Sequence, residues 1–274
     1  MIYIESFDNL QNFATTIKNR KENSVFAKHP ELLISQLDGR AEKVGTSSYE
    51  EAESLLQNGD KTNLAKLKRA NVKNMIQSNS YTANMLKAQK HVCGCLPNIP
   101  LYLIGVPNNM LNFKRTPAKS KIINILVNIA VSYDITANQI IEAGANISSI
   151  IRELEKNGIR VNLYASCFAN RENDYIGFVI NLKKSSAPLN MLNITYPLIN
   201  PSMLRRHFFR FVETIPAKIS SKFVGNYGQV ISFNTMLKHE PKLNKYKDAI
   251  IIDMYDMIGA SVSDMVKTIS DKTK

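Results

Sequence analysis

The sequence predicts an α/β protein in which a doubly wound sheet domain follows a mostly helical cap. The chain has 274 residues and is 44% hydrophobic, which is enough to bury a core without disulfides. A continuous apolar run, Ile122–Val131, is typical of a central parallel strand. From this run onward, strand and helix patterns alternate in the order β-α-β-β-α-β-α, which favours a sheet covered by helices. We therefore divide the chain into a cap, residues 1–115, and a sheet domain, residues 116–274.

Two capped helices are predicted in the cap. Residues 6–18 carry apolar side chains at three- and four-residue spacing after Ser6, a favourable N-cap. The segment 45–59 has Ser48 three residues before a glutamate, the spacing of a capping box, and Gly59 is placed to end the helix.

A change of composition follows these helices. Residues 61–90 have the pattern of a longer helix with its lysines facing outward. Residues 93–110 are rich in Pro and Gly, so we expect a structured loop with one short strand, Leu101–Ile104. Residues 112–120 form a second basic turn.

The elements of the sheet domain are predicted from residues that typically begin or end helices and strands. Thr136 is a good N-cap for a helix that ends at Gly158, and Pro201 stands in the first turn of another helix. Strands are expected at 159–167, 175–182 and 249–252, and a terminal helix is expected from Ser261.

Several classes of protein are excluded by simple features. The run Ile122–Val131 is far shorter than the ~20 residues needed to cross a bilayer, and the N-terminus lacks the basic start of a signal peptide. Three cysteines do not make a disulfide framework, so reduced thiols are expected. We expect a cytoplasmic protein with no membrane partner.

The charge of the chain is concentrated in one segment. The formal net charge is +12, yet no Asp or Glu occurs from Lys61 to Tyr133, where eleven basic residues stand. The rest of the chain has 24 basic and 23 acidic residues. Such one-sided charge indicates a polyanion partner, since lysine and arginine gain affinity from phosphate contacts and counterion release. The alternative is a solvated surface produced by a Lys- and Asn-rich composition.

The predicted anion-binding residues lie in this segment, on the expected helix and on the basic turn. A nucleic acid, another phosphorylated ligand or an acidic protein fits them. They are Lys66, Arg69, Lys73, Lys114, Arg115, Lys119 and Lys121.

A second candidate site lies where the first strand of the sheet domain ends, since such sheets bind ligands at their carboxyl edge. Asn128, Ser132 and Asp134 stand there. Their order resembles the metal-binding Asp-x-Ser-x-Ser motif of von Willebrand factor A domains. Asn128 and Ala130 replace its first Asp and first Ser, and a divalent cation prefers carboxylates. We therefore predict a degenerate edge that holds no metal.

Other motifs give no cofactor or catalytic site. His91, Cys93 and Cys95 lack the second ligand pair of a structural zinc site. The basic and aromatic run 205–211 can contact nucleic acid, but its spacing favours a core face of Leu204, Phe208, Phe211 and Val212 with the arginines outside. No phosphate-binding glycine motif is present, and no cofactor is expected.

Three segments resemble an uncharacterised family of proteins of tailed bacteriophages. These are the helix at 45–59, the loop Pro100–Met110 and the strand-helix-strand unit Ile123–Leu163. The resemblance implies a von Willebrand A-like or Rossmann-like sheet, and it places the protein in the infected host cytoplasm or in the virion. It implies no activity.

We therefore expect a phage-encoded, non-enzymatic protein that binds nucleic acid or another anionic ligand through its basic surface. One alternative is a structural or assembly protein that contacts packaged DNA or a phage protein partner. A second alternative is an enzyme at the edge 128–134, with Ser132, Asp134 and His207 as its polar groups.

Overall fold

A computed structural model describes residues 1–37, 41–65, 86–115, 121–156 and 159–258. Within them, the central sheet has the strand order β1-β7-β6-β5-β9, and β8 pairs with β6 beside this row. Their bounds are β1 Ile2–Phe7, β5 Ile122–Asn128, β6 Arg160–Arg171, β7 Asp174–Lys183, β8 Gln229–Val230 and β9 Ile250–Asp253. The pairs β1/β7, β5/β6 and β5/β9 are parallel, whereas β7 and β8 run antiparallel to β6. The fold is thus mixed α/β with a mostly parallel central sheet.

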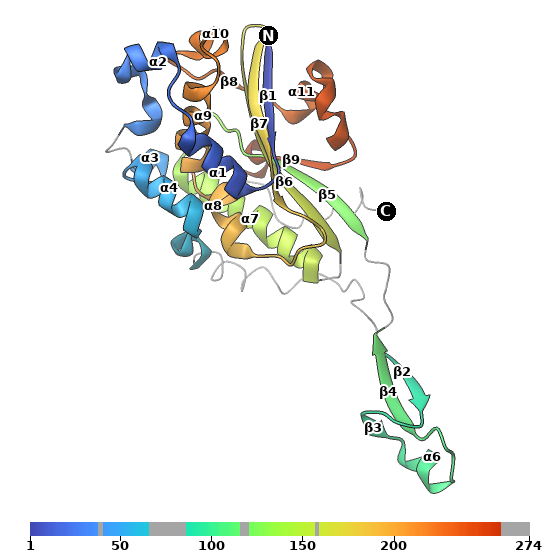
Figure 1. Ribbon diagram of the computed structural model, residues 1–274. Coiled ribbons are helices and arrows are strands. Elements are labelled where there is room, and N and C mark those ends of the chain that lie inside the picture. The colour runs from blue at the N-terminus through green and yellow to red at the C-terminus, as the bar shows by residue number, and fades with distance from the viewer. Residues whose placement is uncertain (38–40, 66–85, 116–120, 157–158, 259–274) are drawn as a thin grey trace.

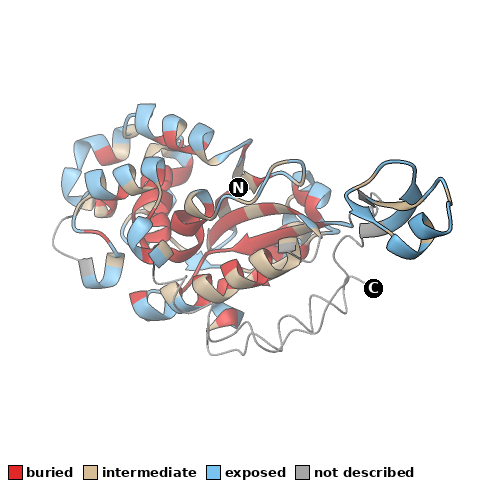
Figure 2. Ribbon diagram, turned by 90° about the horizontal axis from the view of Figure 1, so that it is seen from below, coloured by how far each residue is buried: buried red, intermediate tan, exposed pale blue. Residues whose placement is uncertain are grey.

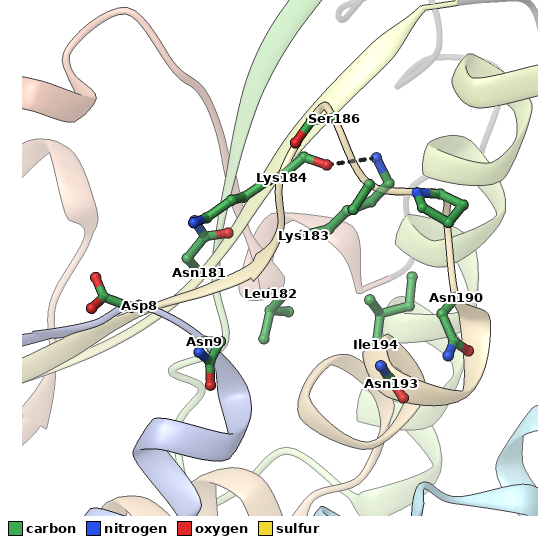
Figure 3. A pocket seen from close by; sticks show the side chains of 12 residues that line it. Asp8, Asn9, Asn181, Leu182, Lys183, Lys184, Ser186, Asn190, Asn193 and Ile194 are labelled. Atoms are coloured by element: carbon green, nitrogen blue, oxygen red, sulfur yellow. Dashed lines mark hydrogen bonds between the residues drawn. The ribbon is translucent and has the colours of Figure 1, made fainter.

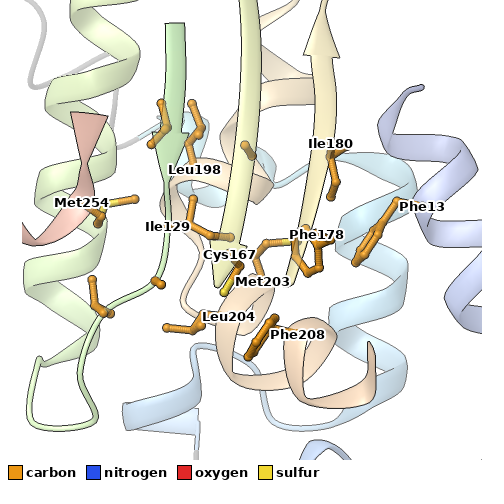
Figure 4. Packing of buried hydrophobic residues seen from close by; sticks show 14 of the residues in the cluster. Phe13, Ile129, Cys167, Phe178, Ile180, Leu198, Met203, Leu204, Phe208 and Met254 are labelled. Carbon is orange, nitrogen blue, oxygen red and sulfur yellow. The ribbon is translucent and has the colours of Figure 1, made fainter. Parts of the chain in front are cut away.

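Alternate residues of the strands face two hydrophobic cores. Ile125 and Val127 lie in the larger core, and Leu126 between them lies in the smaller one. Residues of α1, α4, α7, α8 and α9 pack in the larger core, where Phe13, Cys167 and Phe178 meet (Figure 4). The smaller core is closed by Phe233 and Met236 of α11 and by Leu243 of the adjoining turn. Helices therefore cover both faces of the sheet, as Figure 1 shows.

The helices of this main body are mostly short. The α-helices are α1 Leu10–Asn19, α2 Ser24–Lys28, α3 Ala41–Val44, α4 Tyr49–Asn58, α7 Ala137–Lys156, α8 Met191–Ile199, α9 Phe209–Thr214, α10 Ala217–Ser220, α11 Phe233–His239 and α12 Met254–Met257. Shorter 3-10 turns are η1 Pro30–Leu32, η2 Ile34–Gln36, η4 Ser221–Phe223 and η5 Pro241–Tyr246, and η3 Met203–Phe208 is a π-helical turn.

A second, separate sheet has the order β2-β4-β3 and is antiparallel throughout. It consists of β2 Leu86–His91, β3 Leu96–Pro97 and β4 Met110–Arg115, with the short helix α6 Ile99–Leu103 between β3 and β4. We call residues 86–115 the arm. None of its residues whose burial the structure describes, 88–112, belongs to either hydrophobic core.

Several predicted elements are confirmed. The serine before α4 caps it, since the Ser48 hydroxyl accepts a bond from the Glu51 amide, and Gly59 follows the last turn. Thr136 and Gln139 cap α7 reciprocally through their side chains. The predicted order of strands and helices from Ile122 onward is present as β5, α7, β6, β7, the helical turns η3 and α9 that follow Pro201, and β9, whereas α8 was not predicted.

Four element predictions are wrong. Residues 112–115, expected in the basic turn 112–120, belong to β4 because they pair with β2. Ser6 lies in β1 and does not cap a helix; Asn9 caps α1, because the backbone of residues 2–7 pairs with β7. The stretch 101–104 belongs to helix α6 and its end, not to a strand. The predicted helix over 61–90 contains a strand, β2, which pairs with β4.

The N-terminal region also supplies β1, an edge strand of the main sheet. Residues 61–65 are helical, whereas residues 66–85 and the predicted terminal helix from Ser261 lie outside the described residues. The division at residue 115 stays a prediction.

Candidate functional site

The carboxyl edge of the main sheet holds a buried polar pair. Asn128 ends β5 and Asp253 ends β9, and the two residues are direct partners in the parallel register. The Asn128 amide nitrogen donates to Asp253 Oδ1 at 2.7 Å and to the Ile231 carbonyl at 3.1 Å. Its amide oxygen accepts from the Ala130 backbone amide. Because Asn128 is buried and bonded at both ends, it joins strands and offers no free group to a ligand.

Asp253 has an environment that favours its protonated form. Burial raises the pKa of this carboxyl group, while the hydrogen bond from Asn128 opposes the shift. The neighbouring charge of Asp256 adds to the rise. Sequence reasoning missed Asp253, although its position directly after a predicted buried strand is a usable signal.

Ser132 and Asp134 lie on the loop between β5 and α7, and both are exposed. The Ser132 hydroxyl bonds to the Asp134 carboxylate, and this bond is the main reason that the pKa of Asp134 is lowered. Within the described residues, no hydrogen bond or ion pair connects either side chain to Asn128. The structure therefore does not assemble the three predicted edge residues into one site.

His207 is not available to this edge. It is buried on the π-helical turn, with Tyr49 and Tyr196 beside its ring, and its Nε2 lies 3.3 Å from the Ala52 carbonyl oxygen. Burial lowers the pKa of His207 to about 4. The described hydrogen bonds and ring contacts of His207 involve neither Ser132 nor Asp134, so the groups proposed for an enzyme are not gathered.

The basic and aromatic run is a buried structural element. The predicted core face is confirmed, since Leu204, Phe208, Phe211 and Val212 are all buried. The prediction that the arginines lie outside is wrong, because Arg205, Arg206 and Arg210 are buried as well.

Each of these arginines bonds to the backbone of the N-terminal region. Arg206 donates to the carbonyls of Ser35, Leu37 and Thr46 and to the Thr46 hydroxyl. Arg205 donates to the Lys43 carbonyl, and Arg210 donates to the Arg20 carbonyl. This turn therefore fastens the N-terminal helices to the sheet and presents little charge to solvent.

Beside this turn lies a second buried polar cluster around Glu213. Its carboxylate accepts bonds from the Ser35 amide and hydroxyl and from the Tyr227 hydroxyl. Burial raises the pKa of Glu213, and these bonds counteract it. Since its partners are other buried structural groups, the cluster holds the segments 23–36 and 209–227 together.

An open cavity of about 250 Å³ lies at the opposite edge of the sheet, between the ends of β1 and β7 and the start of α8 (Figure 3). Asp8, Asn9, Asn181 and Asn193 are among its polar lining residues. Lys183 also lines it, but its ammonium group donates to Glu155 Oε1 at 2.7 Å and to two carbonyls. The lining thus combines amide groups with the charged side chains of Asp8 and Lys184.

The described part of the chain contains no group of three or more His, Cys, Asp or Glu residues suited to a metal ion. Cys93 and Cys95 are exposed, and Cys93 Sγ lies 3.4 Å from His91 Nδ1. Cys167 lies in the larger core, where burial raises the pKa of its thiol.

The predicted basic residues are only partly placed. Lys121 is exposed directly before β5. Lys114 and Arg115 are the last two residues of β4, and the register pairs Lys114 with Lys87. The remaining four lie outside the described residues: Lys66, Arg69, Lys73 and Lys119.

Comparison with known proteins identifies the family of the chain. A family model described as a domain of unknown function, DUF7192, matches residues 1–272. The chain belongs to this family. No curated protein and no solved structure matches it.

In this DUF7192 chain, sequence reasoning missed the exposed apolar residues of the arm. Leu103 and Ile104 are 75% and 71% exposed, and Tyr102 is 66% exposed. The signal in the sequence is the absence of any charged residue from Val92 to Phe113. No helix of the described residues is both long enough and apolar enough to cross a bilayer.

Proposed function

We propose that this chain is a non-enzymatic binding protein that holds nucleic acid or another phosphorylated ligand on its basic segment, Lys61–Tyr133. One observation carries the proposal: this segment has eleven basic residues and no acidic one, while the rest of the chain is nearly neutral. Clustered lysines and arginines bind phosphates and release counterions on doing so.

The described basic groups of the segment support this role. Lys61, Lys90 and Lys121 are exposed, and none has an ion pair within the described parts of the chain. Elsewhere, several basic groups are neutralised by carboxylates, for example Lys183 by Glu155 at 2.7 Å and Lys222 by Asp174 at 2.6 Å. An external anion is therefore the natural partner of the basic segment.

The wider setting is part of the same proposal. The resemblance to tailed-phage proteins supports a protein that is made in an infected cell and acts in the host cytoplasm or the virion. A von Willebrand A-like sheet is supported by the parallel strands β6, β5 and β9 and by helices on both faces. The strands β1 and β7 run in the opposite direction, which departs from a simple doubly wound sheet.

A structural or assembly role is the second candidate. It is favoured by one observation, the apolar surface that the arm exposes, because such patches mark sites of contact with another protein or a membrane. The enzyme alternative loses support, since Asn128 is fully bonded and His207 is buried away from Ser132 and Asp134.

The test is to purify the full chain at low salt, denature it, and record the ultraviolet and mass spectra of what is released. The chain has no Trp, so the absorbance of a bound nucleic acid or nucleotide stands out clearly. We expect such material to be released, and a high-salt wash to remove it beforehand. A protein that carries nothing and behaves alike at low and high salt contradicts the proposal.

A further inference from the structure

The arm carries a concentrated apolar surface. Six of its large apolar side chains are more than half exposed, and together they form what we call the tip: Val92, Leu96, Ile99, Tyr102, Leu103 and Ile104. Ile99, Tyr102 and Leu103 lie on α6 and Ile104 ends it, whereas Val92 follows β2 and Leu96 begins β3. In Figure 1, α6 lies at the end of the small sheet farthest from the main body. In the described main body, by contrast, exposed large apolar residues are scattered singly.

The described side chains of the arm, residues 88–112, form no core that accounts for these exposed residues. Every residue of the arm whose burial is described is exposed or half-buried, so Figure 2 shows this unit mostly in pale blue. A small antiparallel sheet needs a buried face or a packed helix for stability. The tip is therefore suited to being covered by something outside the arm.

In the sequence of the arm, charged residues stand on either side of the segment that forms the tip. No charged residue occurs from Val92 to Phe113. Basic residues stand on both sides of this stretch, Lys87 and Lys90 before it and Lys114 and Arg115 after it. The strand register pairs Lys87 with Lys114 at the end of the sheet away from the tip and places Lys90 opposite Leu111, nearer the tip. We call the basic positions of these two strands, which flank the uncharged stretch, the collar.

From this order of an uncharged apolar tip and a basic collar, we propose that the arm docks on an anionic phospholipid surface. The tip enters the boundary between headgroups and acyl chains, and the collar meets the lipid phosphates. Apolar burial and electrostatic attraction then act together, as peripheral binding to anionic membranes requires. The proposal rests on the proposed function and specifies its anionic ligand.

The same order argues against a nucleic acid at the tip. Proteins that bind nucleic acid place their basic groups where they approach the phosphates most closely. Here the exposed large apolar side chains of the arm are aliphatic except for Tyr102. The expectation of no membrane partner came from the lack of a spanning segment, and docking at the surface needs none.

The test measures co-flotation of the full chain with vesicles of phosphatidylcholine alone and of phosphatidylcholine mixed with phosphatidylserine. Two kinds of substitution are each made once in the arm and once outside it, and the variant outside the arm is the control. Ile104→Glu changes the tip, and Ile122→Glu changes an isoleucine that is 59% exposed on β5. Lys90→Glu changes the collar, and Lys247→Glu changes an exposed lysine of the main body.

We expect the wild-type chain to float with the mixed vesicles and not with the neutral ones. Ile104→Glu should weaken this binding about tenfold or more, and Lys90→Glu by several-fold, whereas the two control variants bind like wild type. Since all four side chains are exposed, circular dichroism should show an unchanged fold.

Other outcomes separate this proposal from the proposed function. Binding to mixed-sequence duplex DNA without any vesicle binding overturns lipid docking and leaves the proposed function intact. Failure to bind either probe overturns both. Vesicle binding that Ile104→Glu leaves unchanged, or self-association that this variant abolishes, also overturns docking through the tip.

Discussion

At the scale of single residues, the buried polar groups show what pattern reasoning can recover. Spacing correctly predicted that Phe208 and Phe211 face the core. It placed Arg206 outside, because a regular helix was assumed and the acceptors were far away in sequence. The structure instead has a π-helical turn, and the Arg206 guanidinium donates to carbonyls of Ser35, Leu37 and Thr46. Such long-range acceptors leave no local signal.

His207 leads to a prediction about stability and pH. Its folded-state pKa of about 4 lies below the ordinary value of 6.5, so the folded protein binds fewer protons there than the unfolded chain. The stabilisation by neutral His207 is complete above pH 6.5 and is lost as the pH falls from 6.5 towards 4. We expect a loss on the order of 2 kcal/mol in the free energy of unfolding by pH 5.

The measurement is urea unfolding of wild type and of His207→Gln, which keeps an N–H donor for the Ala52 carbonyl, at neutral pH and at pH 5. Glu213 and Asp253, whose pKa values burial raises, shift stability in the opposite direction but are present in both proteins. The difference between wild type and variant should therefore shrink or reverse at pH 5. An equal difference at both pH values contradicts a buried neutral histidine.

At the scale of elements, local signals succeeded and long-range pairings failed. The capping pattern around Ser48 and Gly59 predicted α4 with its correct ends, since a cap needs only neighbouring residues. The strand β1 was missed because it depends on β7, whose partner residues begin at Tyr175. The arm was missed for the same reason, as β2 becomes a strand only by pairing with β4.

The packing of α7 on α8 gives a prediction at this scale. A Cβ atom added at Gly144 would lie 2.2 Å from the Leu198 carbonyl oxygen and 2.8 Å from the Ile199 Cα. These are backbone atoms, so the two helices must move apart to admit it. Gly144→Ala should therefore lower the free energy of unfolding by about 1–3 kcal/mol, despite the ~1 kcal/mol gain in helix propensity.

Thermal or urea unfolding of Gly144→Ala beside Glu142→Ala measures this cost. Glu142 is exposed on the same helix, so its replacement should change stability by less than about 0.5 kcal/mol. A Gly144→Ala protein as stable as wild type would show that α7 and α8 do not approach so closely.

At the scale of the whole molecule, the sequence showed how charge is distributed along the chain. It did not show which parts of the charged segment are exposed. The acid-free segment is evident by counting, and the basic candidates follow from it. Counting does not reveal that part of this segment forms a sheet outside both cores, or that its uncharged centre is exposed. The predicted edge residues Asn128 and Ser132 failed as a joint site because burial and hydrogen bonding decide availability, and neither is visible in a motif.

The central claim is that the acid-free segment is the anion-binding surface. The salt dependence of DNA binding tests this claim most directly. Affinity for mixed-sequence duplex DNA, used as a phosphate polyanion, is measured against salt concentration for wild type and two fourfold charge reversals. One reverses the basic segment: Lys114→Glu, Arg115→Glu, Lys119→Glu and Lys121→Glu. The control reverses four exposed lysines of the main body: Lys238→Glu, Lys242→Glu, Lys245→Glu and Lys247→Glu.

If the acid-free segment binds the phosphates, affinity falls steeply with salt in wild type and in the control variant. The first variant then binds more weakly, with a log–log salt slope smaller by up to about four, because each reversed side chain leaves about one phosphate without its cation. Equal weakening in both variants, or binding that ignores salt, would contradict the claim.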